Sequence, residues 1–227
     1  MNTEYPPVWI LTLPRSGSTF VCDIFNHCFG NLCVEENFIY EKYHPMYILQ
    51  NKKSFYPRYN KVMPEELFGF EKTYKTSFKS IIGHLPEDTK WIHLKRRDNI
   101  TRLASYFILA QTNLVRKNKN GKDFKKVKFE DVVNFLQQQN SKNPRRHWKK
   151  EIKRNKLKVM KIYYEDFLDD PQLLFNIVKR CGYSEKVAIR AYENNNMKIM
   201  RNTHSKEYSR IVDFVKKTYD EGLVKKQ

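Results

Sequence analysis

The chain has 227 residues, long enough for one α/β domain with a substantial core, and nothing in the sequence requires a second domain. Its 43 basic and 25 acidic residues leave a formal net charge of +18, which attracts polyanions such as a multiply charged nucleotide, a nucleic acid or a sulfated glycan. Four cysteines without paired spacing argue against a disulfide scaffold or a metal site, and the lack of a long apolar run predicts a cytoplasmic protein without a membrane span.

The first predicted elements are a strand, a turn and a helix. Residues 8–13 are apolar or β-branched, which is typical of a buried parallel strand, and a helix is expected over 17–29. Gly17 permits a tight turn, and the free N–H groups at the start of the helix favour an anion. This segment therefore predicts a cradle for phosphate or sulfate. It differs from the nucleotide-binding loop G-x-x-x-x-G-K-[ST], because Ser18 replaces the lysine and the cation is Arg15.

The rest of the chain alternates strands and helices as a parallel sheet requires. Residues 35–64 predict a loop region with short helices that contacts substrate, and residues 117–124 predict a mobile loop because they contain a glycine and almost no apolar side chains. Further strands are expected at 67–72, at 90–95 and after residue 155. Further helices are expected at 77–85, 98–116, 129–155 with a break at Pro144, 171–181, 185–200 and 207–219.

Arg97 follows the strand expected at 90–95, and Ser105 lies eight positions later on the next expected helix. The basic stretch 142–158 is interpreted either as a solvated helix face, with Trp148 turned inward, or as a binding patch.

These two patterns together resemble the sulfotransferases that use 3′-phosphoadenosine 5′-phosphosulfate (PAPS) as donor. Residues 14–19, Pro-Arg-Ser-Gly-Ser-Thr, resemble the loop that binds the 5′-phosphosulfate in that family. Arg97 and Ser105 have the spacing of the residues that bind the 3′-phosphate. The resemblance implies an α/β fold of three layers, P-loop-like, with a central parallel sheet flanked by helices.

A third segment, residues 157–171, resembles the late strand and Tyr-Glu-Asp…Asp-Pro turn of the same family. In this turn we expect Glu165 and Asp166 to brace the chain before a helix that starts near Pro171. Residues 67–72 and 96–98 are most similar to the Stf0-like branch.

The family resemblance implies a donor site, a catalytic cation and no metal. Arg15 is expected to stabilise the sulfuryl group and the bridging oxygen by electrostatics, since arginine does not readily supply a proton. The acceptor is a hydroxyl or an amine of a small molecule, carbohydrate or lipid, and the product is 3′-phosphoadenosine 5′-phosphate (PAP). The donor-binding residues so implied are Arg15, Ser16, Gly17, Ser18, Thr19, Phe20, Arg97 and Ser105.

Two residues are candidates for the general base, and the sequence leaves the choice open. Glu35 follows the first helix, where Stf0-like enzymes carry a Gly-Glu-Pro segment whose glutamate is the proposed base, although here Val34 and Glu36 flank it. His84 stands in Gly-His-Leu-Pro, which resembles the Thr-His-Leu-Pro of cytosolic sulfotransferases and equally suits a cap at a helix end. Plain solvent exposure of Glu35 is as compatible with the sequence as a catalytic role.

Two other functions are compatible with the same residues. The first is a non-catalytic polyanion- or nucleotide-binding module that keeps the fold. The second, a nucleotide-dependent phosphotransferase, is disfavoured because the Gly-Lys pair of the nucleotide-binding loop is missing. No specific nucleic-acid motif occurs in the chain.

Overall fold

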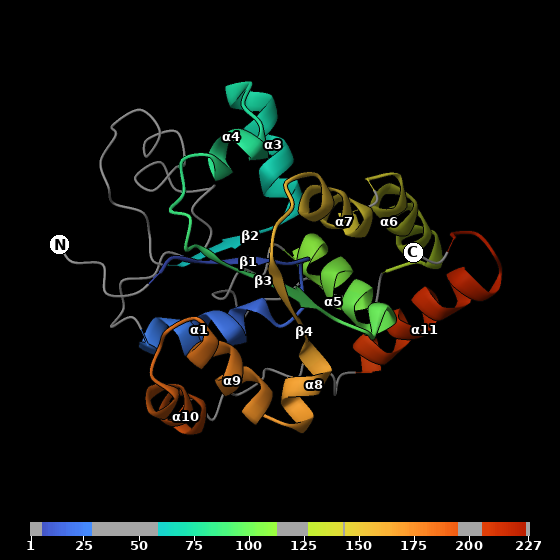
Figure 1. Ribbon diagram of the computed structural model, residues 1–227. Coiled ribbons are helices and arrows are strands. Elements are labelled where there is room, and N and C mark those ends of the chain that lie inside the picture. Colours follow the sequence, from blue (N-terminus) through green and yellow to red (C-terminus); the bar gives the residue numbers. More distant parts are fainter. Residues whose placement is uncertain (1–5, 29–58, 113–126, 143, 195–205, 226–227) are drawn as a thin grey trace. The chain divides into compact units, whose positions relative to one another are not determined.

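The computed structural model describes residues 6–28, 59–112, 127–142, 144–194 and 206–225 (Figure 1). The chain forms two compact units, one made of Met1–Arg97 with Arg146–Met197 and the other of Asp98–Arg145 with Lys198–Gln227. The expectation of a single domain stays a prediction. The expected substrate loop up to residue 58 and the expected mobile loop at 117–124 lie outside the described residues.

The first unit contains a four-stranded parallel sheet. Its strands are β1 (Val8–Leu11), β2 (Tyr59–Val62), β3 (Lys90–Lys95) and β4 (Val159–Tyr163), in the spatial order β2-β1-β3-β4. Leu11 at the end of β1 lies opposite Val62 of β2 and opposite His93 of β3. Because all four strands run in one direction, their carboxyl ends meet at one edge, where sheets of this kind bind ligands.

One face of the sheet is covered by helices that share an apolar cluster with it. Ile10, Ile92 and Ile162 come from three neighbouring strands and contribute to this cluster. The ring of Phe167 stacks on that of Phe20 with a centroid distance of 5.6 Å, which adds an aromatic pair to the layer. The helices of this layer are α1 (Ser18–Cys28), α8 (Tyr164–Asp169), α9 (Gln172–Arg180) and α10 (Glu185–Asn194).

The opposite face of the sheet carries the three tryptophans of the chain. Trp9 and Trp91 lie on neighbouring strands with ring centroids 5.5 Å apart, and Trp148 joins their cluster fully buried. The helices of this layer are α3 (Pro64–Tyr74), α4 (Phe78–Ile82) and α7 (Pro144–Arg154). The sheet therefore lies between two helical layers (Figure 1), and the predicted α/β fold with a central parallel sheet flanked by helices is confirmed.

The second unit is helical. Buried residues four positions apart, such as Leu103 with Phe107 and Ile211 with Val215, form one apolar stripe on each helix and pack in a cluster of their own. Its helices are α5 (Asn99–Thr112), α6 (Phe129–Lys142) and α11 (Lys206–Asp220). The break predicted at Pro144 is confirmed, because α6 ends at Lys142 and α7 begins at Pro144.

The strand predicted at 67–72 is wrong, because these residues belong to α3. Pro64 stands at the first position of this helix, where its missing N–H has no partner to lose. Leu67 is buried whereas its neighbour Phe68 is 39% exposed, so the apolar residues here serve a helix with one buried side. The strand next to β1 is instead β2, Tyr59–Val62. It is mostly polar and contains Lys61, so it does not stand out as an apolar run in the sequence.

None of the helices in the described ranges is long and apolar enough to cross a membrane. In the same ranges Cys22, Cys28 and Cys181 are free thiols. No group of three or more His, Cys, Asp or Glu side chains among these residues could hold a metal ion.

Candidate anion-binding site

The loop that follows β1 is anchored at its first residue. The N–H of Thr12 donates to the carbonyl of Val62 at 3.1 Å, which extends the pairing of the strands by one residue. The indole Nε1–H of Trp148 donates to the carbonyl of Thr12 at 2.7 Å, and both groups are buried. The loop therefore starts from a backbone position that is held on both sides.

The loop itself has a left-handed backbone at two residues. Arg15 has φ 62° and Gly17 has φ 78°, and only the glycine adopts such a value without steric cost. A Cβ on Gly17 would overlap the ring of Tyr164, so glycine is required here by the space as well as by the backbone. The side chain of Arg15 is exposed.

The helix α1 begins directly after this loop and supplies anion-binding groups. The first N–H groups of an α-helix, here those of Ser18 and Thr19, have no acceptor within the helix. They lie at the N-terminus, which is the positive end of the helix dipole. Ser16 is buried at 1% exposure, and its Oγ has no hydrogen-bond partner among the described residues. A buried hydroxyl without a partner is costly unless a ligand supplies one. The loop therefore has the form of the cradle predicted from the sequence.

Phe20 was predicted among the donor-binding residues, and its side chain lies in the apolar core. Its ring is 7% exposed and contacts Phe167 and, edge to face, Tyr192 at 5.6 Å. Only the backbone of Phe20 can therefore contribute to a donor site. Thr19 is exposed at the surface of the same helical turn.

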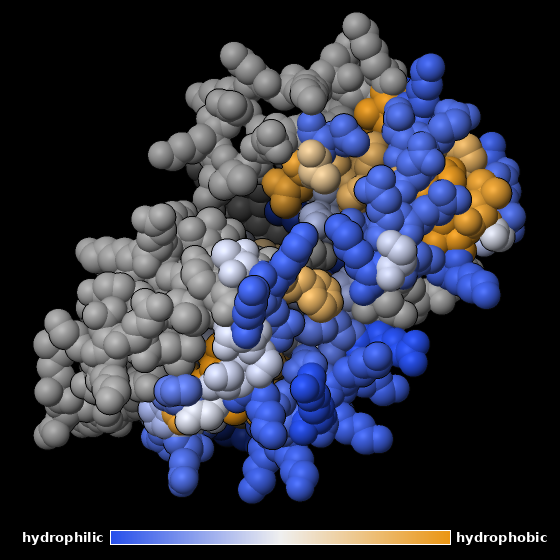
Figure 2. All heavy atoms as spheres, turned by 90° about the horizontal axis from the view of Figure 1, so that it is seen from above, coloured by the Kyte–Doolittle hydropathy of each residue, from blue (hydrophilic) through white to orange (hydrophobic). Residues whose placement is uncertain are grey.

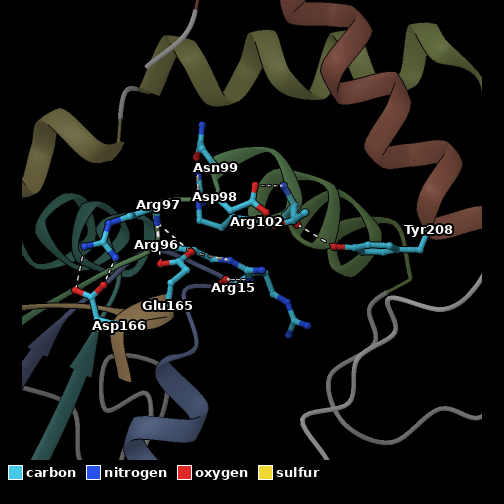
Figure 3. Close-up of polar contacts among 10 residues, drawn as sticks. Arg15, Arg96, Arg97, Asp98, Asn99, Arg102, Glu165, Asp166 and Tyr208 are labelled. Atoms are coloured by element: carbon cyan, nitrogen blue, oxygen red, sulfur yellow. Dashed lines mark hydrogen bonds and ion pairs between the residues drawn. The ribbon is translucent and has the colours of Figure 1, made fainter. Parts of the chain in front are cut away.

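A second backbone segment, after β3, lies against this loop through Arg96 and Glu165. The Nη1 of Arg96 donates to the carbonyl of Arg15 at 3.1 Å, and its Nε lies 3.8 Å from the Glu165 carboxylate (Figure 3). The two carboxylate oxygens of Glu165 also accept the N–H of Arg97 at 3.1 and 3.0 Å. These contacts join the ends of β1, β3 and β4 at one edge of the sheet.

The side chain of Arg97 pairs with Asp166, whereas that of Arg96 contacts Arg15 and Glu165. The guanidinium of Arg97 makes a two-point ion pair with Asp166, and the side chains are 52% and 34% exposed (Figure 3). The hydrogen bond from Arg97 lowers the pKa of Asp166 and raises that of Arg97 itself. The ring of Tyr163 lies 4.1 Å from the guanidinium carbon. Since the pair is exposed, an incoming anion can exchange with the carboxylate.

The helix expected near Pro171 is confirmed as α9, with Pro171 at its N-cap, but Glu165 and Asp166, which were expected to brace the turn before it, lie in a separate helix. A further helix, α8, starts at Tyr164, so both carboxylates lie in its first turn and hold Arg96 and Arg97. Arg96, Tyr164 and the arginine-binding role of Glu165 were missed by sequence reasoning. The available signal was the adjacent Arg-Arg pair facing an adjacent Glu-Asp pair in a later segment.

Ser105, the second predicted ligand of the 3′-phosphate, lies on α5 in the second unit. The helix begins after Asp98, whose carboxylate accepts the N–H of Thr101 at 3.0 Å, and Tyr208 of α11 donates to the carbonyl of Thr101 at 3.3 Å (Figure 3). Ser105 is half-buried one turn further along. Arg97 ends the first unit, so the joint grip of Arg97 and Ser105 on one phosphate stays a prediction.

The two candidate bases have different outcomes. Glu35 lies outside the described residues. His84 is exposed after the end of α4, and its Nδ1 lies 2.8 Å from the carbonyl of Ser80, as in a helix C-terminal cap. It precedes β3, whose first residue Lys90 donates its N–H to Pro7 before β1. His84 therefore lies toward the edge where the strands begin, away from the loop that follows β1.

A buried histidine that sequence reasoning did not single out lies on β3. His93 is 9% exposed, beside Leu11 of β1 and Lys161 of β4. Burial and the charges of Lys95 and Lys161 lower its pKa to about 4. His93 is therefore a neutral side chain near neutral pH.

No protein-family model matches this chain, and no curated protein matches it. The solved structures similar to it include retinol dehydratase in complex with androsterone and the inactive cofactor PAP, at 16% sequence identity and a TM-score of 0.48. Another is retinol dehydratase in a complex with retinol and PAP, at 16% identity and a TM-score of 0.47. Each match covers 92% of this chain and 70% of the other. The function proposed below rests on the residues of this chain.

Proposed function

We propose that this protein is a sulfotransferase that moves a sulfuryl group from PAPS to a hydroxyl or an amine. The observation that carries the proposal is the cradle after β1, in which the buried Ser16 Oγ lacks a partner next to the start of α1. An anionic oxygen of a ligand would supply that partner and would also meet the first N–H groups of the helix. The likeness of residues 14–19 to the phosphosulfate loop of sulfotransferases supports the phosphosulfate of PAPS as that anion.

In this proposal different residues of the cradle bind the sulfuryl group and activate it for transfer. PAPS would supply the sulfuryl group, and PAP would leave with the negative charge on its 5′-phosphate as the bond between sulfur and the bridging oxygen breaks. In this proposal the exposed guanidinium of Arg15 stabilises that charge by electrostatics. Ser16, Ser18 and Thr19 add hydroxyl and N–H donors that are fixed by the loop and by α1, so they need little reorganisation during transfer. Gly17 contributes a left-handed backbone and a close approach to Tyr164 that would be strained for a residue with a side chain.

In this proposal Arg97 and Ser105 bind the 3′-phosphate of the donor. The exposed ion pair of Arg97 with Asp166 leaves the guanidinium exchangeable, which suits a residue that takes a phosphate on binding. The general base is Glu35 or His84. The capped, exposed position of His84 favours Glu35. The finer assignment to the Stf0-like branch rests on residues 96–98, since the other similar segment, 67–72, is helical.

The test is calorimetric titration with PAP, next to ATP plus magnesium at the same ionic strength, because a basic protein binds anions loosely in any case. We expect PAP to bind in the micromolar range or tighter and ATP much more weakly. Arg97→Ala should weaken PAP far more than adenosine 5′-phosphate, because only PAP carries the 3′-phosphate. Equal weakening of both ligands would refute the assignment of Arg97. Turnover with PAPS should be lost in Glu35→Gln and kept in His84→Gln, and the reverse result would move the base to His84.

A polyanion-binding module is the second candidate, and the surface of α7 favours it. Lys149, Lys150 and Lys153 are exposed there, and the only acidic residue of the helix, Glu151, is buried with a hydrogen bond from Asn155 at 3.0 Å. Figure 2 shows hydrophilic residues over much of the described surface on one face. Comparable weak binding of PAP, ATP and heparin would favour this module over the sulfotransferase.

A further inference from the structure

The side chain of Arg96 contacts the backbone of the cradle from outside the loop. Its Nη1 donates to the carbonyl of Arg15 at 3.1 Å. Its guanidinium carbon lies 5.1 Å from the centre of the Tyr164 ring, the same ring that fills the space beside Gly17. The side chain is 21% exposed, so it lies mostly beneath the surface, unlike that of Arg97.

The peptide that Arg96 holds is a strained one. Arg15 has φ 62°, a left-handed conformation that is unfavourable for a residue with a side chain. The peptide plane between Arg15 and Ser16 is fixed at both ends, because its carbonyl accepts from Arg96 and its N–H donates to Leu13 at 3.3 Å. Without the first contact, the carbonyl of Arg15 would lose a charged donor, and the left-handed turn would lose a group that compensates its cost.

Glu165 holds Arg96 in turn and links it to the second anion-binding segment. Its carboxylate lies 3.8 Å from Arg96 Nε and accepts the N–H of Arg97 through both oxygens. One carboxylate thus fixes both the arginine that supports the cradle and the backbone of the arginine assigned to the 3′-phosphate. Tyr164 and Glu165 are consecutive residues at the start of α8: the ring of Tyr164 lies against Gly17, whereas Glu165 acts on Arg15 only through Arg96.

From these contacts we infer that Arg96 is a positioning residue for the anion cradle. In this inference Arg96 contacts the loop, and the ligand is bound by Arg15, Ser16 and the start of α1. Its function is to keep the Arg15–Ser16 peptide in the orientation that aims Ser16 Oγ and the following N–H groups at the anion, and Glu165 keeps Arg96 in place. The adjacent arginines therefore have different tasks, since Arg97 exchanges its carboxylate partner for a ligand and Arg96 does not. The link to catalysis rests on the proposed function, whereas the link to loop shape does not.

The experiment compares Arg96→Ala and Arg96→Lys with Arg190→Ala, which removes an exposed arginine of α10 and so controls for charge. Two readouts are measured on the full chain: the affinities for PAP and for adenosine 5′-phosphate, and the hydrogen exchange of the amides of residues 15–20. We expect Arg96→Ala to weaken both ligands by a similar factor, about tenfold or more, because both place a 5′-phosphate in the cradle. Exchange at 15–20 should speed up while that of α9 and α10 stays unchanged.

The conservative variants separate positioning from charge. Arg96→Lys keeps the charge but lacks the fork that spans the carbonyl and the carboxylate, so it should restore the affinities only in part. Glu165→Gln should weaken the ligands in the wild-type chain and add little in the Arg96→Ala background. The inference is overturned if Arg96→Ala matches Arg190→Ala in both readouts, or if it weakens PAP alone, as Arg97→Ala should. If the wild-type chain binds neither ligand, the proposed function fails, and the hydrogen exchange alone then supports or overturns the role of Arg96 in loop shape.

Discussion

Gly17 offers a test in which the cost of a single methyl group can be divided into two physical parts. Gly17→Ala places a Cβ on a residue with φ 78°, which costs about 1–2 kcal/mol. The same Cβ overlaps the ring of Tyr164, and overpacking of this kind costs a further 1–3 kcal/mol, as a rough range. We therefore expect the free energy of unfolding to fall by roughly 2–5 kcal/mol in total.

The assay is urea unfolding followed by tryptophan fluorescence, which reports the first unit because Trp9, Trp91 and Trp148 all belong to its core. The matched control is Gly83→Ala. Gly83 has ordinary φ of −62°, and its added Cβ would meet only backbone oxygens at 3.5 and 3.6 Å, so this change should be close to neutral.

The double variant with Tyr164→Ala separates the two costs. Removing the ring should relieve the overlap and leave only the backbone cost, so Gly17→Ala should be less damaging in that background by about 1–3 kcal/mol. Equal costs of Gly17→Ala with and without the Tyr164 ring would refute the steric argument. A cost no larger than that of Gly83→Ala would refute the argument from the backbone as well.

Three further predictions concern the residues around the cradle. Trp148→Phe should lower the free energy of unfolding by roughly 2–4 kcal/mol in urea titrations and should weaken PAP, because the carbonyl of Thr12 loses its buried donor; unchanged stability would contradict this. His93 has its pKa lowered to about 4, so between pH 6.5 and 4 the unfolded chain binds a proton that the folded chain does not, and stability should fall on acidification by up to ~1.4 kcal/mol per pH unit. His93→Gln should flatten that slope, and an identical pH profile would show that other groups cause it. Asp166→Asn should free Arg97 and tighten PAP several-fold in calorimetry, whereas weaker binding would mean that the carboxylate orients Arg97 for its ligand.

The strand, turn and helix that form the cradle could be predicted from the sequence because their signals are local. An apolar strand, a glycine and the start of a helix follow one another within 8–20, and each has a direct physical reading. The position of β2 could not be read in this way, since Tyr59–Val62 pairs with β1 through its backbone while its side chains are mostly polar. Backbone hydrogen bonds do not require apolar side chains, so the hydrophobicity of so short a strand does not indicate its pairing.

The partners of Arg96 and Arg97 were beyond sequence reasoning for a different reason. Glu165 and Asp166 lie 68 and 69 positions later in the chain than Arg97, and only the parallel pairing of β3 with β4 brings these segments together. Within their own segment, two acidic residues before a proline-containing turn are explained by the start of a helix. Nothing in that segment therefore indicated that they contact the arginines. The sequence could therefore indicate which residues carry charge at the site, but not which charges face one another.

The outer strand β4 carries exposed lysines. In the sheet formed by the described residues, β4 lies at one end of the order β2-β1-β3-β4. Lys161 of β4 and the preceding Lys158 are exposed, and a lysine on an outer strand discourages a second chain from adding to the sheet, since that chain would have to bury or repel the charge. Some of the excess positive charge can thus have a purely structural effect, which needs no ligand.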